Sequence, residues 1–505
     1  MTGPGDASGG GLLTLVTELR AANAGLVARI AEQDARLAER DQRIAVQDKR
    51  IAVQDKRIAE LERRLSRNSG NSSMPPSSDD LPGRKKPAPR PGRGSGRRGK
   101  QPGAPGSGLA WREVPEETVP HFPRGACGCG ADLEEALDLG VQRSHQVHEV
   151  PLVTVTVTQH DLHRVRCGCG REHTATRPAE VAGAPASYGR NLAALVVYLV
   201  VFQHVPVERC ALLVADVTGA KPSVGLVHSI LARAAAALGD VMRLVKTLIT
   251  AACVVGFDET TLRCGKAGAK RYVLSASTEL FTVFGLGGRD LDSFTTFAVL
   301  PAFTGIAVHD RYSLYDNPAF AGVGAHQLCA AHILRDLADA AEAHPDHHWP
   351  AQASRALAAL IRAWRAARAA GQGAIPGQVA GPLITEFRQA VRVGLSQIAR
   401  VPGVNAKQAP GRCLLEYLRD RENDVLRFAT DTRVWPTNNL SERDLRPTKT
   451  QQKISGRLTS EDVTADRLTI RGYISTAAKH GVNIMTVLRD TIAGTPWAPP
   501  LPAPT

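Results

Sequence analysis

The chain has 505 residues and a formal net charge of +13, from 62 Lys and Arg against 49 Asp and Glu. This length allows several domains, and the basic excess suggests a polyanionic partner, although an ordinary basic protein would show the same excess. The most apolar run, residues 192–202, is too short to span a bilayer. The first residues lack a basic stretch followed by an apolar one, so the sequence predicts a cytoplasmic protein whose nine cysteines are thiols or metal ligands.

Residues 1–66 are predicted to form a coiled-coil, leucine-zipper-like helix. Branched apolar residues recur every seven positions at Ile30, Leu37, Ile44, Ile51, Ile58 and Leu65. The second seam position is mostly polar, with Gln33, Arg40, Gln47 and Gln54 before Leu61. Polar seam residues cost stability, so we expect a weak homodimer or higher oligomer, with a solitary charged helix as the alternative.

Residues 67–108 read as a basic, disordered linker. They are dense in Ser, Pro, Gly and Arg, with too few apolar side chains to offset the entropy of ordering. A flexible basic arm binds phosphates without sequence preference, so Arg97, Arg98 and Lys100 are predicted DNA contacts. The alternative is a solubilising tether, and both roles can hold together.

Residues 109–182 are predicted to be a small, zinc-ribbon-like β domain, that is, a zinc-finger-like domain. An alternating strand at residues 152–158 separates two cysteine pairs, and one structural Zn²⁺ would bind the four thiolates of Cys127, Cys129, Cys167 and Cys169. The Cys-x-Cys spacing is tighter than the usual Cys-x-x-Cys, so His173 or His121 could replace one thiolate. Incidental free thiols are the alternative.

Residues 183–248 are predicted to be helical, with helices at 191–204, 207–218 and 223–238. The short Gly-containing turn at 219–222 gives the last two a helix-turn-helix-like pattern. In that arrangement Ser223, His228 and Arg233 would face a DNA groove. A plain helical spacer is an equally good interpretation.

Period-two patterns begin at residue 249. Strands are expected at 253–257, 271–277, 280–286, 294–299 and 305–309, within a first core segment at 249–325. An all-helical insertion follows at 326–430, with breaks near Pro345 and at 371–382. Residues 431–460 complete the core, with a basic helix-and-turn segment from 440 to about 457. Residues 461–505 hold final helices at 467–479 and 484–492, and a Pro-rich tail.

Three acidic residues stand out by their positions relative to the predicted strands and helices. Asp258 and Asp310 follow two of the strands, and Glu442 lies in the later helix. Carboxylates so arranged can hold two divalent cations that clamp the oxygens of a phosphodiester. Taken alone, Asp258 could cap a turn, Asp310 could cap a helix that begins at Arg311, and Glu442 could pair with Arg446 at helical spacing.

Order and spacing favour the functional interpretation. The layout is that of a ribonuclease H-like α/β core interrupted by a helical insertion, within a multidomain α+β protein. Basic side chains, suited to a DNA phosphate track, follow the last acid at Arg443, Arg446, Lys449, Lys453 and Arg457.

The chain resembles the large transposase of the insertion-sequence-66 family over nearly its whole length. The resemblance rests on residues 67–79, 99–106 and 475–481, the paired cysteines, the 326–332 segment with Cys329 and His332, and the Asn438-Asn439-x-x-Glu442-Arg443 motif. Cys329 and His332 are not assigned as a zinc site, since core packing and a helix hydrogen bond explain them equally well.

The resemblance implies a DDE transposase of the bacterial cytoplasm, associated with the nucleoid and not with a membrane. Asp258, Asp310 and Glu442 would hold two Mg²⁺ or Mn²⁺ ions for cleavage at the terminal inverted repeats and strand transfer into target DNA. Small accessory proteins encoded by the same element are possible partners. Two other classes remain as alternatives: a stand-alone nuclease and a non-catalytic DNA-binding protein.

Overall fold

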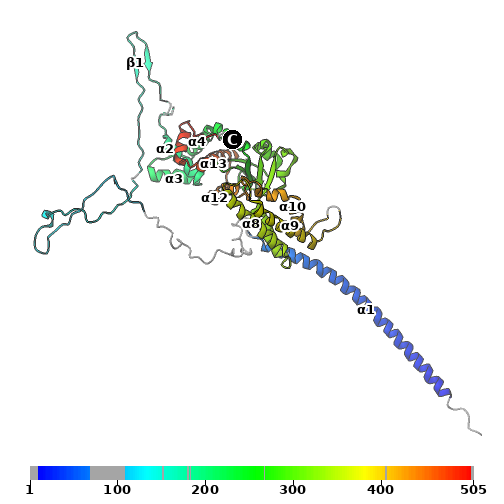
Figure 1. Cartoon of the computed structure of the whole chain (residues 1–505). Helices are drawn as coiled ribbons and strands as arrows, with labels where there is room; N and C mark the ends of the chain where they lie inside the picture. The colour runs from blue at the N-terminus through cyan, green and yellow to red at the C-terminus, as the bar shows by residue number, and fades with distance from the viewer. Residues whose placement is uncertain are drawn as a thin grey trace, which may run out of the picture. The chain divides into compact units, whose positions relative to one another are not determined.

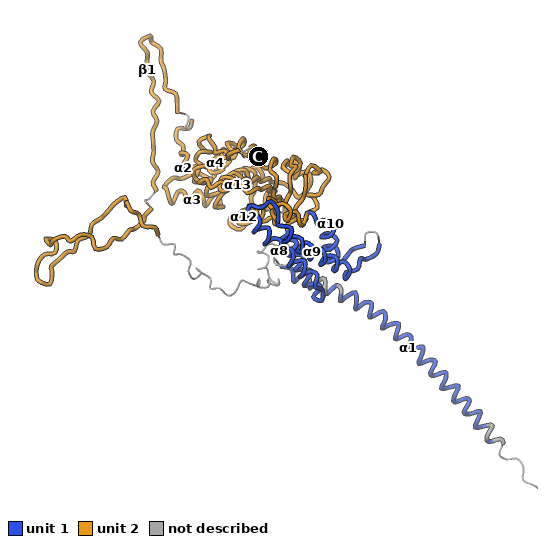
Figure 2. Tube along the Cα trace, in the orientation of Figure 1, with its two compact units in different colours: residues 1–88, 330–423 blue, residues 89–329, 424–505 orange. Residues whose placement is uncertain are grey.

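The computed structural model describes residues 9–68, 109–150, 153–178, 181, 183–266, 268–403 and 406–501. Figure 1 shows a mixed α+β chain with a long N-terminal helix and a central sheet. The chain divides into two compact units, residues 1–88 with 330–423, and residues 89–329 with 424–505 (Figure 2). The predicted linker contacts Arg97, Arg98 and Lys100 lie outside the described residues, as do motif residues 69–79 and 99–106.

The first unit contains the predicted zipper helix. Helix α1 runs without interruption over Gly9–Ser66 (Figure 1). Its heptad residues Ile30, Leu37, Ile44 and Ile51 are each more than half exposed. The helix is therefore as expected, and its apolar seam is not covered by the described residues of its own chain. A partner for this seam stays a prediction.

The rest of the first unit is the helical insertion, with α7 (Ala330–Ala343), α8 (Trp349–Ala369), α9 (Gly377–Gln397), α10 (Pro410–Asp420) and, across its boundary, α11 (Glu422–Leu426). The indole of Trp349 is fully buried here, against the bare α-carbon of Gly394. The insertion begins at residue 330 rather than 326. The break expected at 371–382 is shorter, because α9 contains Pro382 while burying Ala380 and Phe387.

The second unit is built on a five-stranded sheet in the order β5-β4-β3-β6-β7. Its strands are β3 (Val254–Leu262), β4 (Arg271–Ser277), β5 (Thr282–Gly287), β6 (Ile306–His309) and β7 (Ala325–Leu328). β3, β4 and β5 pair antiparallel, whereas β3, β6 and β7 pair in parallel. The parallel half brings the ends of β3 and β6 to the same edge.

Three strand predictions need correction. Residues 294–299, expected as a strand, lie mostly in helix α6 (Leu291–Phe297), because the Asp290 side chain caps the N–H of Ser293. The strand β7 was missed, since its four residues Ala-His-Gln-Leu carry no β-branched side chain. β3 continues past residue 257 to Leu262 because β4 pairs with it there.

Helices that precede and follow these strands in the chain pack against the sheet. They are α2 (Arg190–Val197), the π-helix η3 (Tyr198–Phe202), α3 (Val207–Thr218), α4 (Val224–Ala237), α5 (Gly239–Thr250), α12 (Asn439–Ile454), α13 (Glu461–Lys479) and α14 (Ile484–Ile492). One buried cluster joins Ile230 of α4, Phe257 of β3 and Tyr473 of α13. The predicted helix-turn-helix-like region thus packs into the sheet's core.

Among the described residues, no single helix is long and apolar enough to cross a membrane, although the bent pair α4 and α5 together meets the length and composition of a span.

Three predicted helices of this region are present in modified form. The first ends in the π-helix η3, while α3 has the predicted bounds and α4 nearly so. Ser223 was expected to face a groove, but its side chain instead accepts a hydrogen bond from the N–H of Leu226 and caps α4. His228 and Arg233 are exposed.

The segment from 109 to 178 has little regular structure among its described residues. It holds the 3₁₀ turn η2 (Leu133–Glu135) and a hairpin of β1 (Arg164–Arg166) with β2 (Glu172–Thr174). Residues 153–158 form no strand, so the strand predicted at 152–158 is wrong over those residues. The alternating Val side chains there have no buried face to pack against.

Outside this segment, the 3₁₀ turns are Leu300–Ala302, Ser313–Asp316, Pro318–Phe320 and Arg427–Ala429.

Candidate active site

Two aspartates lie on neighbouring strands where the parallel pairing ends. The last paired residues of β3 and β6 are Gly256 and Val308. Asp258 and Asp310 follow these residues by two positions each, so both lie at the edge of the sheet where the parallel pairing ends. Asp310 comes just after β6, as predicted. Asp258 was expected after its strand and lies inside β3 instead, because β4 extends the pairing.

Gly256 allows α12, the helix that carries Glu442, to pack closely on β3. A β-carbon on Gly256 would press on the Ser441 hydroxyl and lie 2.9 Å from Asn438 Oδ1. The start of α12 therefore rests directly on β3. Because strand side chains alternate, it rests on the face from which Asp258 projects. Glu442 is the next residue after the fully buried Ser441.

Three contacts hold α12 in this position. The Asn438 side chain donates from Nδ2 to the Phe257 carbonyl at 2.7 Å, and its backbone N–H donates to Cys329 Sγ at 3.2 Å. One turn later, Asp444 pairs with Lys479 of α13 at 2.7 Å. Cys329 and Asn438 thus position the helix. Asn439 is exposed as the first residue of α12, and His332 lies in α7 of the other unit.

The charges of the neighbouring acids act on Asp258. Burial, followed by the charges of Glu259, Asp310 and Glu442, raises the pKa of the Asp258 carboxyl well above its ordinary value. Each aspartate is oriented through one oxygen: Asp258 Oδ1 accepts from Glu259 N–H at 2.9 Å, and Asp310 Oδ1 from Tyr312 N–H at 2.8 Å. Asp310 and Glu442 therefore lie near enough for their like charges to act on Asp258, although no group of ligand atoms within 4.8 Å among the described residues contains all three acids.

Glu259 belongs to a different environment from its neighbour Asp258. Its side chain is 3% exposed and pairs with Arg289 at 2.8 Å. Tyr315 also donates its hydroxyl to Glu259 Oε2 at 2.7 Å. Burial and the charge of Asp310 raise the pKa of Glu259, against these two partners. Glu259 is not one of the three predicted acids, and its carboxylate is engaged by Arg289 and Tyr315. Arg289 and Tyr315 gave no sequence signal, because their role depends on tertiary contact.

A buried histidine supports the backbone of Asp310. His309 is fully buried, and its Nδ1 lies 2.5 Å from the Asp310 carbonyl oxygen while its Nε2 lies 2.9 Å from His326 Nδ1. Burial, then His326, lowers the pKa of His309 to about 4. His309 is therefore neutral at pH 7 and bears its proton on Nδ1, facing the carbonyl. Asp316 and these two histidines offer ligand atoms within 4.8 Å of one another, a grouping that the sequence analysis missed.

The predicted basic residues lie on the surface of α12 and just beyond it. All five are exposed: Arg443, Arg446, Lys449, Lys453 and Arg457. With 100° per residue, Arg446, Lys449 and Lys453 project within about 40° of the direction of Glu442. The helix therefore presents a row of cations on the side that bears the acid, and Leu445 is buried on another side.

The four predicted zinc ligands form two matching turns. In each, the first cysteine N–H donates to the carbonyl four residues later and its carbonyl accepts from the glycine three residues later, all at 2.8 Å. Hydrogen bonds from the turn backbone, then from the paired cysteine, lower the pKa of Cys129 and of Cys167. Among the described residues, no group of three or more ligand atoms within 4.8 Å includes these thiols. The structure therefore brings each pair together, and not the four.

Neighbouring carboxylates beside a row of exposed cations are typical of an enzyme that acts on a nucleic-acid backbone. The model of a family described as "Transposase IS66 family" matches residues 185–465, more than half of the chain. The chain belongs to this family and is therefore a transposase, an enzyme that cleaves and transfers DNA. This confirms the resemblance found in the sequence. A second model, for a family of unknown function (DUF6444), matches residues 12–110. No curated protein matches the chain.

Proposed function

We propose that the enzyme is a DDE transposase with a ribonuclease H-like core, which cleaves at the terminal inverted repeats of its element and joins them to target DNA. The observation that carries this proposal is the approach of α12 to β3 at Gly256. It adds Glu442 to a pair of aspartates that lie at the edge of the sheet where the parallel pairing ends. The sheet order, with its antiparallel first half and parallel second half, supports the ribonuclease H-like assignment.

The acid site suits divalent cations. Asp258 and Asp310 each have one oxygen fixed by a backbone N–H, and neither Oδ2 is hydrogen-bonded to the described residues. Asn438 Oδ1, beside them, is a buried oxygen without a hydrogen-bond donor among those residues, which suits a hydrated ion. Asp258, Asp310 and Glu442 would hold two Mg²⁺ or Mn²⁺ ions. Bound there, the ions would supply an activated nucleophile and neutralise the charge developing on the phosphodiester.

The residues around the acids would position DNA. The exposed cations Arg443, Arg446, Lys449 and Lys453 would receive backbone phosphates along α12, and Arg457 would extend this track. Asn438 and the Asp444–Lys479 pair would hold Glu442 in reach of the scissile bond. Such positioning supplies much of the rate in phosphoryl transfer.

We further propose that the remaining regions recognise the element ends. Cys127, Cys129, Cys167 and Cys169 would bind one Zn²⁺, supported by the two matching turns with lowered thiol pKa. Exposed His228 and Arg233 on α4 would contribute DNA contacts, as would the predicted linker residues Arg97, Arg98 and Lys100. Small accessory proteins from the same element would act beside it.

The exposed seam of α1 would pair two protomers so that both element ends are held together. Deleting residues 12–65 removes this seam, and we expect the oligomer to dissociate to a monomer. Light scattering measures the mass of each chain. A truncated chain that keeps the mass of the full-length oligomer would contradict the pairing role.

Strand transfer of a precut element end tests the catalytic proposal. Asp258→Asn, Asp310→Asn and Glu442→Gln should each reduce joining by about 10³-fold or more, the scale seen when one member of a catalytic unit is removed. End binding should stay, since the exposed cations are untouched. Asp292→Asn and Glu208→Gln, exposed acids in α6 and α3, serve as matched controls and should retain activity.

The same assay separates the alternatives. A stand-alone nuclease would cut the element end and never join it, and a DNA-binding protein without activity would do neither. Full joining by any one of the three variants would remove that residue from the site.

A further inference from the structure

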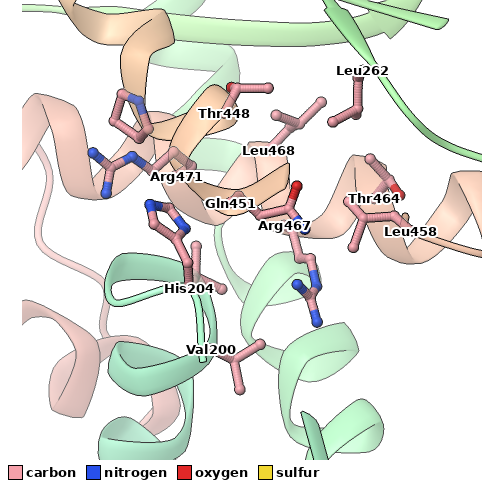
Figure 3. Close-up of a pocket in the computed structure, with 12 residues that line it drawn as sticks. Val200, His204, Leu262, Thr448, Gln451, Leu458, Thr464, Arg467, Leu468 and Arg471 are labelled. Carbon is pink, nitrogen blue, oxygen red and sulfur yellow. The ribbon is translucent and has the colours of Figure 1, made fainter. Parts of the chain in front are cut away.

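A pocket in the second unit collects buried cationic groups that the proposed catalytic site does not use. It lies between α12, α13 and the end of η3, and holds about 410 Å³ of empty space including its open mouth. We call it the arginine pocket and define it by Arg467, Arg471, Gln451 and His204, with apolar walls that include Val200 and Leu262 (Figure 3).

Two arginines enter the pocket from one face of α13, four residues apart. Arg467 is 9% exposed. Arg467 Nε, Arg471 Nε and Arg471 Nη1 are buried and donate no hydrogen bond within the described residues, where neither side chain forms an ion pair. The nearest acid to act on Arg471 is Asp444, whose carboxylate is paired with Lys479. The Arg471 guanidinium stacks over the Phe202 ring, 5.1 Å from its centroid, but among the described residues neither arginine has the anionic partner that buried charges normally have.

Gln451 adds a third unsatisfied group. It is 7% exposed, projects into the pocket between the arginines (Figure 3), and neither atom of its carboxamide is hydrogen-bonded among the described residues. On α12 it stands about 180° around from Glu442, counting nine residues at 100° each. The pocket therefore lies behind the catalytic face and is separate from the three acids.

The floor of the pocket has an unusual backbone. The π-helix η3 (Tyr198–Phe202) leads into His204, whose φ of 60° is in the left-handed region that non-glycine residues rarely adopt. π-Helical turns and such strained residues concentrate at functional sites. Burial, then Arg471 and Arg467, lowers the pKa of His204 to about 4, so at pH 7 it is neutral and adds no competing charge.

We propose that the arginine pocket binds a phosphate group. Guanidinium groups and an amide N–H are donors that bind phosphate oxygens, and apolar walls strengthen each charge-assisted hydrogen bond. The phosphate could come from the backbone of bound DNA or from a free nucleotide or inorganic phosphate. The site itself does not depend on the proposed catalytic function, and only the DNA source does.

Thermal unfolding of the full-length chain in phosphate and in chloride, at equal ionic strength, tests this site. Phosphate should raise the melting temperature of the wild-type chain in a saturable way. Arg467→Met and Arg471→Met should each weaken the apparent phosphate affinity at least tenfold. Arg489→Met, an exposed arginine in α14, is the matched control and should respond as wild type. Equal melting of the wild type in both salts, as expected of a pocket filled by water alone, overturns the proposal.

A second measurement uses the unmodified chain, so it does not depend on how the variants fold. Phenylglyoxal labels the arginines that it can reach, which for Arg467 and Arg471 is through the open mouth of the pocket, and peptide mapping by mass spectrometry reports each position. Phosphate should protect Arg467 and Arg471 and leave Arg489 labelled. Equal labelling of all three with and without phosphate also overturns the site.

The source of the phosphate is read from DNA binding. If a backbone phosphate enters the pocket, Arg471→Met reduces the slope of log affinity against log salt by about one contact, and DNA blocks the phosphate-induced rise in melting temperature. An unchanged slope with loss of the phosphate response assigns the pocket to a free phosphate. Phosphate binding that survives in Asp258→Asn, which should not join DNA, keeps this result distinct from the catalytic test.

Discussion

The acid site on β3, β6 and α12 and the cysteine segment at 109–178 are built in opposite ways. The acids are set by strand register and by a helix packed on a glycine, within a core that includes Phe257 and Tyr473. The cysteines are exposed, in a segment whose strands have three residues each. Strand register and helix packing set the positions of the acids in the first site and crowd like charges there. In the second, only the local turns are formed.

From this difference we expect a metal to contribute to folding in the cysteine segment and only to chemistry at the acid site. A structural zinc ion supplies folding free energy to a segment too small to bury a core. A divalent cation at a preformed carboxylate site relieves repulsion without being needed to build it. The predictions below can break or sharpen this contrast, and run from the largest expected effect to the smallest.

Gly256→Ala should cause the largest loss among the changes outside the three acids, because the position of α12 depends on this bare α-carbon. The added methyl would meet Ser441 and Asn438 at the start of α12 and push Glu442 outward. A displacement of about 1 Å can cost roughly 10²-fold in rate. Strand transfer of a precut end is the measurement. Gly225→Ala in α4, where the nearest atom is 4.0 Å away, is the control. Normal joining by Gly256→Ala would show that α12 does not need this contact.

Removal of zinc should act on DNA recognition and spare the core. Chelation, or Cys127→Ser together with Cys167→Ser, should lower the preference for the element end over random DNA by about tenfold or more, since each lost base contact is worth about 1–3 kcal/mol. Competition binding measures this preference, and metal analysis of the purified chain counts the zinc. The melting of the core should not change. Normal end recognition by a metal-free chain would remove zinc from this segment.

Sequence patterns predicted the parts of this fold that depend on local chemistry. The bounds of β4, α3 and α14 follow from their own alternation, caps and helical period, and match the structure. The three acids could also be placed, because strand ends and the Asn438–Arg443 motif are visible in the chain itself.

Tertiary contacts decided what the sequence could not show. No sequence pattern shows that α12 packs on Gly256, or that Glu259 bonds to Arg289 and Tyr315. The segment 294–299 has β-branched residues, yet the cap from Asp290 makes most of it a helix. The arginine pocket likewise exists only because α12 and α13 lie together, and in sequence Arg467 and Arg471 look like ordinary helix residues.

The smallest expected effect concerns the repulsion within the acid site. Burial and neighbouring acids raise the pKa of Asp258 in the folded chain above its unfolded value. The folded state then binds the proton more tightly, so the carboxyl favours folding below its unfolded pKa and loses that contribution as pH rises through the folded pKa. At pH 7, in a chelator, Asp258→Asn should therefore raise the free energy of unfolding by about 1 kcal/mol.

Thermal or denaturant unfolding measures this gain, which should shrink as pH falls towards the ordinary carboxyl pKa. Adding Mg²⁺ should stabilise the wild-type chain more than Asp258→Asn, because the cation binds the charges that the variant has reduced. The exposed variant Asp292→Asn should show neither response. If Asp258→Asn instead destabilises the chain at pH 7 without metal, the carboxylate is a structural acceptor, and the acid site is not a charged centre that the fold prepares for cations.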